Sequence, residues 1–128
     1  MSRVVLDASA ILAVLNSEPG GDKLTPELLN QAASSTVNLA EVHSKLVSQG
    51  GNPEEAWEDT LSPIREAVPF TAGQAKIAGT LIKHTRALGL SLGDRACLAL
   101  GLALKAPIYT ADKSWKSLKL GIRIHVIR

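Results

Sequence analysis

Residues 4–15 read VVLDASAILAVL, and this stretch sets the architecture that we expect for the whole chain. Its first three residues are bulky and apolar, which is typical of a short buried strand. Asp7 follows, and Ala8–Leu15 then has the composition of a helix that ends before the turn-forming residues 18–21. A buried strand that leads directly into a helix is the opening of a β-α-β arrangement.

The rest of the chain repeats this alternation of short apolar stretches and helical segments. We expect further strands at residues 35–37, 68–70, 108–110 and 122–127. We expect further helices at residues 26–33, 38–49, 71–88, 92–105 and 113–118, and one that begins at Pro53. The pattern predicts an α/β fold in a single domain, residues 1–128, with helices on both faces of a central parallel sheet of about four to five short strands.

The composition is typical of a globular protein, with 45% hydrophobic and 20% charged residues. The single cysteine, Cys97, excludes a disulfide within the chain and fits a reducing cytosol. Cys97 stands in the apolar run 96–104, so we expect a buried structural thiol. That run is shorter than the ~20 residues that a membrane span requires, and Asp7 interrupts the only stretch that resembles a signal peptide. We therefore expect a cytoplasmic protein that does not contact a membrane.

Charge is distributed unevenly along the chain. Residues 1–66 contain 4 Lys or Arg against 10 Asp or Glu, whereas residues 67–128 contain 10 against 2. The basic half is a candidate track for a phosphate backbone, but folding could equally interleave the two halves and cancel the field. The basic residues nearest to the candidate site described next are Arg86, Arg95, Lys113, Lys116 and Lys119.

The candidate site consists of four acids: Asp7, Glu41, Asp94 and Asp112. Asp7 and Asp112 each follow a predicted strand closely, and ligand sites in open parallel sheets form beyond the carboxyl ends of the strands. Asp94 begins a helix that is otherwise largely apolar, so we expect its carboxylate to lie in a partly buried place. These positions favour a cluster of carboxylates at one edge of the sheet.

Each acid also has a purely structural explanation. Asp7 and Asp112 could each cap the helix that follows. Asp94 is the third residue after Ser91, which is the spacing of a capping box. Glu41 could pair with the lysine one helical turn further on. The sequence alone leaves these alternatives open for each residue taken singly.

Taken together, the four carboxylates favour a bound divalent cation. A buried carboxylate is costly unless it is paired or bound to a metal ion, and Arg95 is a poor partner for Asp94 because adjacent helical positions do not face each other. Several carboxylates that converge would also repel one another, and a divalent cation removes this repulsion. Oxygen ligands suit Mg²⁺ or Mn²⁺ better than zinc.

Other chemistries fit the sequence poorly. It contains no glycine-rich phosphate loop and no Gly-x-Ser-x-Gly elbow. His43, His84 and His125 lack the spacing of metal ligands. No aspartate occurs between Asp59 and Asp94, which excludes the mid-chain phosphoacceptor of a receiver domain.

The sequence resembles the PIN-domain family and, within it, the VapC-type toxins of bacterial toxin–antitoxin modules. The stretches that carry the resemblance follow the family order: VVLDASAILAVL, EPGG, SSTVNLAEV, GLSLGDRACLALGLAL and IYTADKSW. The most specific part is GLSLGDRACLAL followed by TAD at residues 110–112. Residues 50–66 add nothing to the resemblance.

The resemblance implies a PIN-like three-layer α/β/α fold in which Asp7, Glu41, Asp94 and Asp112 are the catalytic acids. It implies an endoribonuclease that uses Mg²⁺ or Mn²⁺ to hydrolyse RNA, forms homodimers and is silenced by a cognate antitoxin that also binds operator DNA. Asp7 and Asp94 are then the strongest candidates for direct metal ligands. Glu41 and Asp112 would bind the metal directly, bind it through water or orient the attacking water.

Two other functions remain open from the sequence. A PIN-like module could bind RNA or a protein partner without cutting, although the complete set of acids argues against this. A nuclease that cuts DNA is a third possibility, but the chain is small and lacks insertions that would clamp a duplex.

Overall fold

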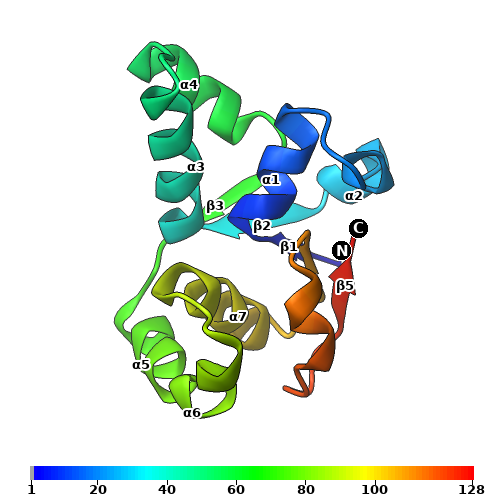
Figure 1. The fold of residues 1–128 in the computed structure, drawn as a ribbon, viewed down its shortest axis with the longest axis vertical. Helices are drawn as coiled ribbons and strands as arrows, with labels where there is room; N and C mark the ends of the chain where they lie inside the picture. The colour runs from blue at the N-terminus through cyan, green and yellow to red at the C-terminus, as the bar shows by residue number, and fades with distance from the viewer. Residues whose placement is uncertain (1) are drawn as a thin grey trace.

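The computed structural model describes residues 2–128 and contains a central five-stranded sheet (Figure 1). The strands lie in the order β3-β2-β1-β4-β5, and every pair of neighbours is parallel. Their bounds are β1 Val4–Leu6, β2 Ala32–Ser35, β3 Glu66–Val68, β4 Ile108–Thr110 and β5 Ile124–Val126. The predicted α/β fold with a parallel sheet is therefore confirmed.

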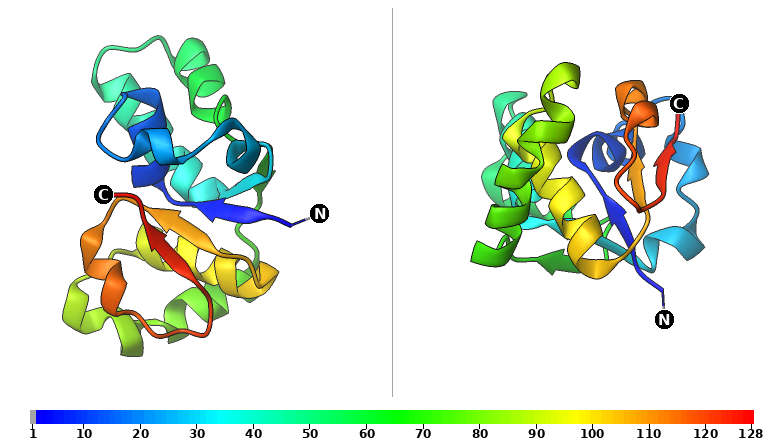
Figure 2. Two further views of the ribbon diagram at one scale, coloured as in Figure 1. Left: turned by 90° about the vertical axis from the view of Figure 1, so that its right-hand side faces the viewer. Right: turned by 90° about the horizontal axis from the view of Figure 1, so that it is seen from below.

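Helices cover both faces of this sheet and make a three-layer structure (Figure 2). One face carries α1 Ala8–Leu15, the 3-10 helix η1 Gly21–Lys23, α2 Pro26–Leu29, α3 Thr36–Ser48 and α4 Pro53–Leu61. The other face carries α5 Ala72–Thr80, α6 Ile82–Thr85, η2 Arg86–Leu88, α7 Leu92–Leu104 and η3 Lys113–Ser117. Among residues 2–128, no helix has the length and apolar character that crossing a membrane would need.

Two apolar clusters form the core, one on each side of the sheet. Successive residues of β1 supply both clusters, because side chains alternate between the faces of a strand. Val4 and Leu6 pack with α1 and α3, whereas Val5 packs with α7. Cys97 and Leu98 of α7 are completely buried, which confirms the prediction of a buried thiol. This packing fixes the strand end that carries Asp7.

The second strand lies earlier than the sequence indicated. We expected it at residues 35–37, but β2 ends at Ser35 and α3 begins at Thr36. The side chain of Ser35 accepts a hydrogen bond of 3.2 Å from the backbone N–H of Val37 and thereby caps α3. The buried run Ala32–Ser35 extends in the sheet instead, and α2 is correspondingly shorter than predicted.

The long helix predicted at residues 71–88 is wrong, because the chain forms α5, α6 and η2 in succession there. The hydroxyl groups of Thr80 and Thr85 donate to carbonyl oxygens four residues earlier, at 2.9 and 3.0 Å. Such bonds compete with the helical ladder and bend helices. Gly89 ends the segment as predicted, with a φ of 66° that favours glycine. Elsewhere β3 begins two residues earlier than predicted, and the short helix predicted at residues 113–118 is present as the 3-10 helix η3.

Candidate active site

The four predicted acids line one pocket of about 310 Å³ at the carboxyl ends of β1 and β4. The residues around it are Asp7, Ala8, Ser9, Leu12, Asn38, Glu41, Lys45, Asp94 and Asp112. They come from the β1–α1 junction, from α3, from the first turn of α7 and from the β4–η3 junction. The parallel sheet therefore assembles a site from segments that are far apart in the sequence.

Asp7 is the most deeply buried of the four acids, with 3% of its surface exposed. Its Oδ1 accepts a hydrogen bond of 2.8 Å from the backbone N–H of Ala10, and Oδ2 accepts one of 2.6 Å from the hydroxyl of Thr110. Burial raises the pKa of Asp7 to about 6, against the hydrogen bonds from Thr110, Ala10 and Ser9, which favour the ionised form. The nearby charge of Asp94 raises the pKa further.

Two hydroxyl groups join Asp7 to the end of β4. Ser9 donates to both carboxylate oxygens of Asp7, at 2.7 and 2.9 Å, and accepts a hydrogen bond of 2.9 Å from the N–H of Ala111. Thr110 accepts a hydrogen bond of 3.0 Å from the N–H of Asp112 while it donates to Asp7. The relative position of the two aspartates is thus set by a continuous network.

Asn38 connects α3 to the first turn of α7. Its Nδ2 donates to Glu41 Oε1 at 2.8 Å and to the carbonyl oxygen of Gly93 at 3.0 Å. These two acceptors fix the orientation of the amide, because only the nitrogen can donate. Asn38 is 1% exposed, and its Oδ1 is buried without a hydrogen-bond partner among residues 2–128. Asn38 therefore holds Glu41 and leaves one unsatisfied oxygen beside the pocket.

Gly93 makes room for the carboxylate of Glu41. A Cβ atom at position 93 would lie 2.5 Å from Glu41 Oε2 and 2.6 Å from Oε1, well inside van der Waals contact. Because Gly93 is in the first turn of α7, the carboxylate also lies at the positive end of that helix. Any larger residue at position 93 would displace Glu41.

Asp94 and Asp112 each use one carboxylate oxygen to cap a helix. Ser91 and Asp94 form a reciprocal capping box, with distances of 2.9 and 3.1 Å, at the start of α7. Asp112 Oδ1 accepts hydrogen bonds from the backbone N–H and the hydroxyl of Ser114, at 2.9 and 2.8 Å. In both aspartates the second oxygen takes no part in the cap and is available to a ligand.

The structural explanations for the three aspartates are correct, since Asp7, Asp94 and Asp112 all cap helices. The explanation for Glu41 is wrong: no ion pair between Glu41 and Lys45 occurs within the described part of the chain, and Glu41 is bound by Asn38. Capping and chemistry are compatible roles, because a cap occupies only one of two carboxylate oxygens.

Of the basic residues near the acids, only Lys45 lines the pocket itself. Arg95 points elsewhere: its guanidinium donates to the carbonyl oxygen of Ala78 at 3.0 Å and so joins α7 to α5. Lys113 is exposed directly after Asp112. The thiol of Cys97 is buried near the acids, and burial together with the charges of Asp7, Asp94 and Glu41 raises its pKa well above the usual value.

The oxygen donors around the pocket are of the kind that a hard divalent cation prefers. In the observed arrangement, however, they are too far apart to bind one together. Within residues 2–128, no three acidic, histidine or cysteine side chains are close enough to hold a metal ion together. However, the carboxylate of Asp7 is buried at a cost that a cation would offset, and Asn38 Oδ1 is an unsatisfied oxygen. The side chains of Glu41, Asp94 and Asp112, which line the same pocket, would have to move closer to Asp7 to complete such a site.

The sequence reasoning missed three residues of the site: Ser9, Asn38 and Gly93. A signal existed for Asn38, because it precedes Glu41 by three residues and so shares its helical face. The partners of Ser9 and Gly93 lie far away in the sequence, at Ala111 and Glu41, and no local pattern reveals them.

Comparisons with known proteins agree with this architecture. The sequence profile of the PIN domain matches residues 4–120. A toxin–antitoxin complex from Klebsiella pneumoniae contains a similar chain, with a TM-score of 0.77, 15% identity and 98% coverage of both chains. VapBC2 from Rickettsia felis, bound to a promoter DNA fragment, gives a TM-score of 0.72, 21% identity and coverage of 94% of this chain and 96% of that one.

A third similar structure is VapC20 from Mycobacterium tuberculosis, described as a sarcin–ricin loop cleaving toxin. It gives a TM-score of 0.72 and 18% identity, with coverage of 94% of this chain and 98% of that one. No curated protein sequence matches the chain. These structural similarities concern the fold alone, whereas the profile match spans most of the sequence. The chain is therefore a member of the PIN-domain family.

Proposed function

We propose that this protein is a Mg²⁺- or Mn²⁺-dependent endoribonuclease and the toxin of a toxin–antitoxin pair. The observation that carries the proposal is the pocket in which Asp7, Glu41, Asp94 and Asp112 meet at the carboxyl ends of β1 and β4. Such a group of oxygen donors can bind divalent cations and act on a phosphodiester without a protein nucleophile. The similarity to a toxin that cleaves the sarcin–ricin loop supports RNA as the substrate.

The carboxylates have distinct tasks in this proposal. A bound Mg²⁺ or Mn²⁺ would lower the pKa of a coordinated water and stabilise the charge on the phosphate. Asp7 and Asp94 would hold the cation, and Ser9 and Thr110 keep the carboxylate of Asp7 in one orientation. Glu41, fixed by Asn38, and Asp112 orient the attacking water or accept its proton.

Inhibition by an antitoxin follows from the same charges. Four carboxylates around one pocket leave a negative potential where the cation is absent, and an arginine can pair with two carboxylate oxygens at once. We infer that a cognate antitoxin inserts a basic side chain there. The Klebsiella and Rickettsia structures are toxin–antitoxin assemblies, which supports a partner of this kind. We also propose that the toxin acts as a cytoplasmic homodimer of single-domain chains.

The central prediction is loss of RNA cleavage when Asp94 is changed to Asn. The amide keeps the size of the side chain and an oxygen that can cap α7, but it removes a negative charge from the pocket. We expect a decrease of more than about a hundredfold in cleavage rate, and a similar loss in EDTA, because metal ions supply several kcal/mol of catalysis. Cleavage of labelled RNA with purified protein measures both effects.

The control is Asp59→Asn, which removes the same charge from an exposed position of α4 and should leave cleavage unchanged. Thermal melting of each variant establishes that α7 remains folded. Full activity in EDTA, or undiminished activity of Asp94→Asn, would contradict the metal-dependent mechanism.

A second candidate function is a PIN-like module that binds RNA or a protein without cutting. One observation favours it: no three acidic side chains of the described residues lie close enough to bind a metal ion as arranged. If wild-type protein binds RNA but shows no cleavage with Mg²⁺ or Mn²⁺, and calorimetry detects no cation binding, this alternative replaces the nuclease.

A further inference from the structure

The segment that joins β4 to β5 carries most of its charge on exposed lysine and arginine side chains. It leaves the acidic pocket at Asp112, forms η3 and returns to the opposite end of the sheet, because β4 and β5 are parallel (Figure 1). Its basic residues are Lys113, Lys116, Lys119 and Arg123, and all four are exposed. Asp112 is its only acidic residue.

Two adjoining hollows lie along this segment. The first, of about 460 Å³, is lined by Lys116, Leu118, Lys119, Leu120, Gly121, Ile122, Arg123, Ile124 and His125. The second, of about 700 Å³, is lined by Ser2, Arg3, Val4, Leu102, Lys105, Ala106, Pro107, Gly121, Ile122 and Arg123. Residues 121–123 line both hollows, and no carboxylate lines either of them.

The charges on this surface are not neutralised by neighbours. Within the described part of the chain, the ion pairs are Arg3 with Glu66 and Arg128 with Glu18. Lys105, Lys116, Lys119 and Arg123 take part in neither pair. Only Arg3, at the far border, is already paired.

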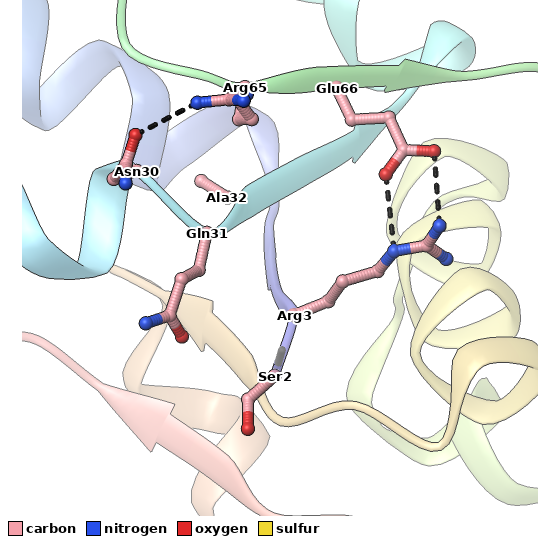
Figure 3. A pocket seen from close by; sticks show the side chains of 7 residues that line it. All are labelled: Ser2, Arg3, Asn30, Gln31, Ala32, Arg65 and Glu66. Atoms are coloured by element: carbon pink, nitrogen blue, oxygen red, sulfur yellow. Dashed lines mark hydrogen bonds and ion pairs between the residues drawn. The ribbon is translucent and has the colours of Figure 1, made fainter.

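A nearby pocket provides a contrast. Figure 3 shows Arg3 turned toward Glu66 and Arg65 turned toward Asn30 in the hollow between the starts of β1, β2 and β3. The distances are 3.2 Å from Arg3 Nε to Glu66 Oε1 and 3.1 Å from Arg65 to Asn30 Oδ1. The arginines of that pocket are satisfied within the protein, whereas the basic groups of the β4–β5 segment are not.

We propose that the surface formed by Lys105, Lys116, Lys119 and Arg123 binds single-stranded RNA that flanks the cleaved bond. This inference rests on the proposed ribonuclease function and names the path that the substrate takes away from the pocket. A strand that leaves the pocket at Asp112 meets Lys113 and Lys116 within one short helix and then the first hollow. Each phosphate that pairs with one of these side chains releases condensed counterions, which favours binding.

The apolar floor of the first hollow suits a nucleic acid that is single-stranded. Leu118, Leu120, Ile122 and Ile124 are half-buried there, and unpaired bases and riboses can cover such a surface. A second copy of this chain is a poor occupant, because it would bring the same positive charges face to face.

The test is a triple variant, Lys116→Ala with Lys119→Ala and Arg123→Ala. Its matched control is Lys23→Ala with Lys76→Ala and Lys83→Ala, which removes three exposed positive charges from η1, α5 and α6. Binding of labelled single-stranded RNA of about sixteen nucleotides is measured in EDTA by fluorescence anisotropy at several salt concentrations. Cleavage with Mn²⁺ is measured in parallel on this RNA and on a fragment of about four nucleotides.

We expect the triple variant to bind the long RNA about tenfold more weakly, with a salt slope reduced by about two, because about 0.7 is lost for each phosphate contact to a single strand. The ratio of kcat/KM on long RNA to that on short RNA should fall by a similar factor. The control should bind like the wild type. Equal losses of RNA affinity in both triple variants, or no loss in either, would overturn the proposal. The proposal would also be overturned if polyglutamate competed with the labelled RNA as strongly as unlabelled RNA does. If wild-type protein binds RNA in this pattern but cuts neither substrate, the nuclease proposal fails and the binding surface stands.

Discussion

Asp7 occupies a buried position in which the charged form of its carboxylate is unfavourable. The side chain is almost completely buried, and its pKa of about 6 reflects the cost of keeping a carboxylate ionised there. Hydrogen bonds from Ser9, Thr110 and the N–H of Ala10 recover part of that cost. A residue arranged in this way is expected to trade stability for the ability to bind a cation.

Changing Asp7 to Asn should therefore stabilise the metal-free protein above pH 6. The folded-state pKa is raised from 3.8 to about 6, so ionisation of Asp7 lowers the free energy of unfolding as the pH increases from about 4 to 6. The full cost, at most about 3 kcal/mol, applies above pH 6 and is removed in the variant. Thermal melting in EDTA should show a higher Tm for the variant at pH 8 and little difference at pH 4.

Asp22→Asn is the matched control, because Asp22 is exposed and its loss should not change the pH dependence. Excess Mn²⁺ should raise the Tm of the wild type and not that of Asp7→Asn. A lower Tm for Asp7→Asn at pH 8 would show that the hydrogen-bond network needs the charged carboxylate.

At the scale of secondary-structure elements, the first turn of α7 depends on the absence of a side chain at Gly93. Gly93 allows the carboxylate of Glu41 to lie against α7, where Asn38 binds it. The contact between α3 and α7 therefore sets both the packing of two helices and the geometry of an acid. We expect a substitution in this turn to reduce RNA cleavage strongly and to change the free energy of unfolding only slightly.

The corresponding prediction concerns Gly93→Ala. The new methyl group would occupy the place of the Glu41 carboxylate, which is the far end of a flexible side chain and can move away if it gives up its hydrogen bond to Asn38. RNA cleavage should fall to the level of Glu41→Gln, while the Tm stays equal or rises, because alanine is the better helix former by up to about 1 kcal/mol. Cleavage assays and thermal melting measure the two effects.

Gly79→Ala is the control, since a Cβ at this position of α5 meets nothing within 4 Å. It should be as stable as Gly93→Ala or more so and should retain full activity. If Gly93→Ala cleaves RNA at the wild-type rate, the observed position of Glu41 is not needed for the chemistry.

Local sequence patterns predicted those elements whose cause is local. Val4–Leu6 followed by Asp7 and an alanine- and leucine-rich segment gave β1 and α1 with the observed bounds. The break at Thr85 was not predictable from apolar spacing, because it involves a hydroxyl group that bonds to its own helix. The start of α3 was misplaced because Ser35 serves as the last residue of β2 and as the cap of α3.

The same distinction applies to the site. The family motifs could predict the four acids that line the pocket, and only Asp7 and Asp112 could also be predicted from their places directly after strands. The contacts of Asn38 with Gly93 and of Ser9 with Ala111 cross 55 and 102 positions of sequence. Only the assembled sheet brings these groups together, so their roles had to come from the structure.

At the scale of the whole molecule, the uneven charge along the sequence becomes uneven charge in space. The helices of the acidic half, α1–α4, cover one face of the sheet, and the elements of the basic half, α5–α7 and η3, cover the other (Figure 2). The alternative in which folding interleaves the two halves is therefore wrong for the helical layers. The acidic pocket lies where these layers meet at one edge of the sheet.

Expression of this protein alone should slow bacterial growth, and co-expression of a cognate antitoxin should restore it. The expectation rests on the proposed cleavage of RNA at the acidic pocket and on the proposed blockage of this pocket by a basic side chain of the partner. Growth curves and co-purification with the product of a neighbouring gene provide the measurement. Asp94→Asn, expressed at the same level, should have no effect on growth.

If the wild-type protein does not slow growth and no neighbouring gene product co-purifies with it, the toxin–antitoxin assignment is wrong. A PIN-domain ribonuclease with another role in the cell would remain compatible with cleavage in vitro.

Three of the four acids cap helices and the fourth does not, and this difference affects how such a protein can change over evolutionary time. Asp94 and Asp112 each hold the start of a helix, so most substitutions there would weaken the fold by about 1 kcal/mol as well as the site. Glu41 is exposed and caps no helix. If the proposed function is correct, a lineage can therefore lose catalysis at position 41 and keep its fold, which offers a direct route from an enzyme to an inert binding protein.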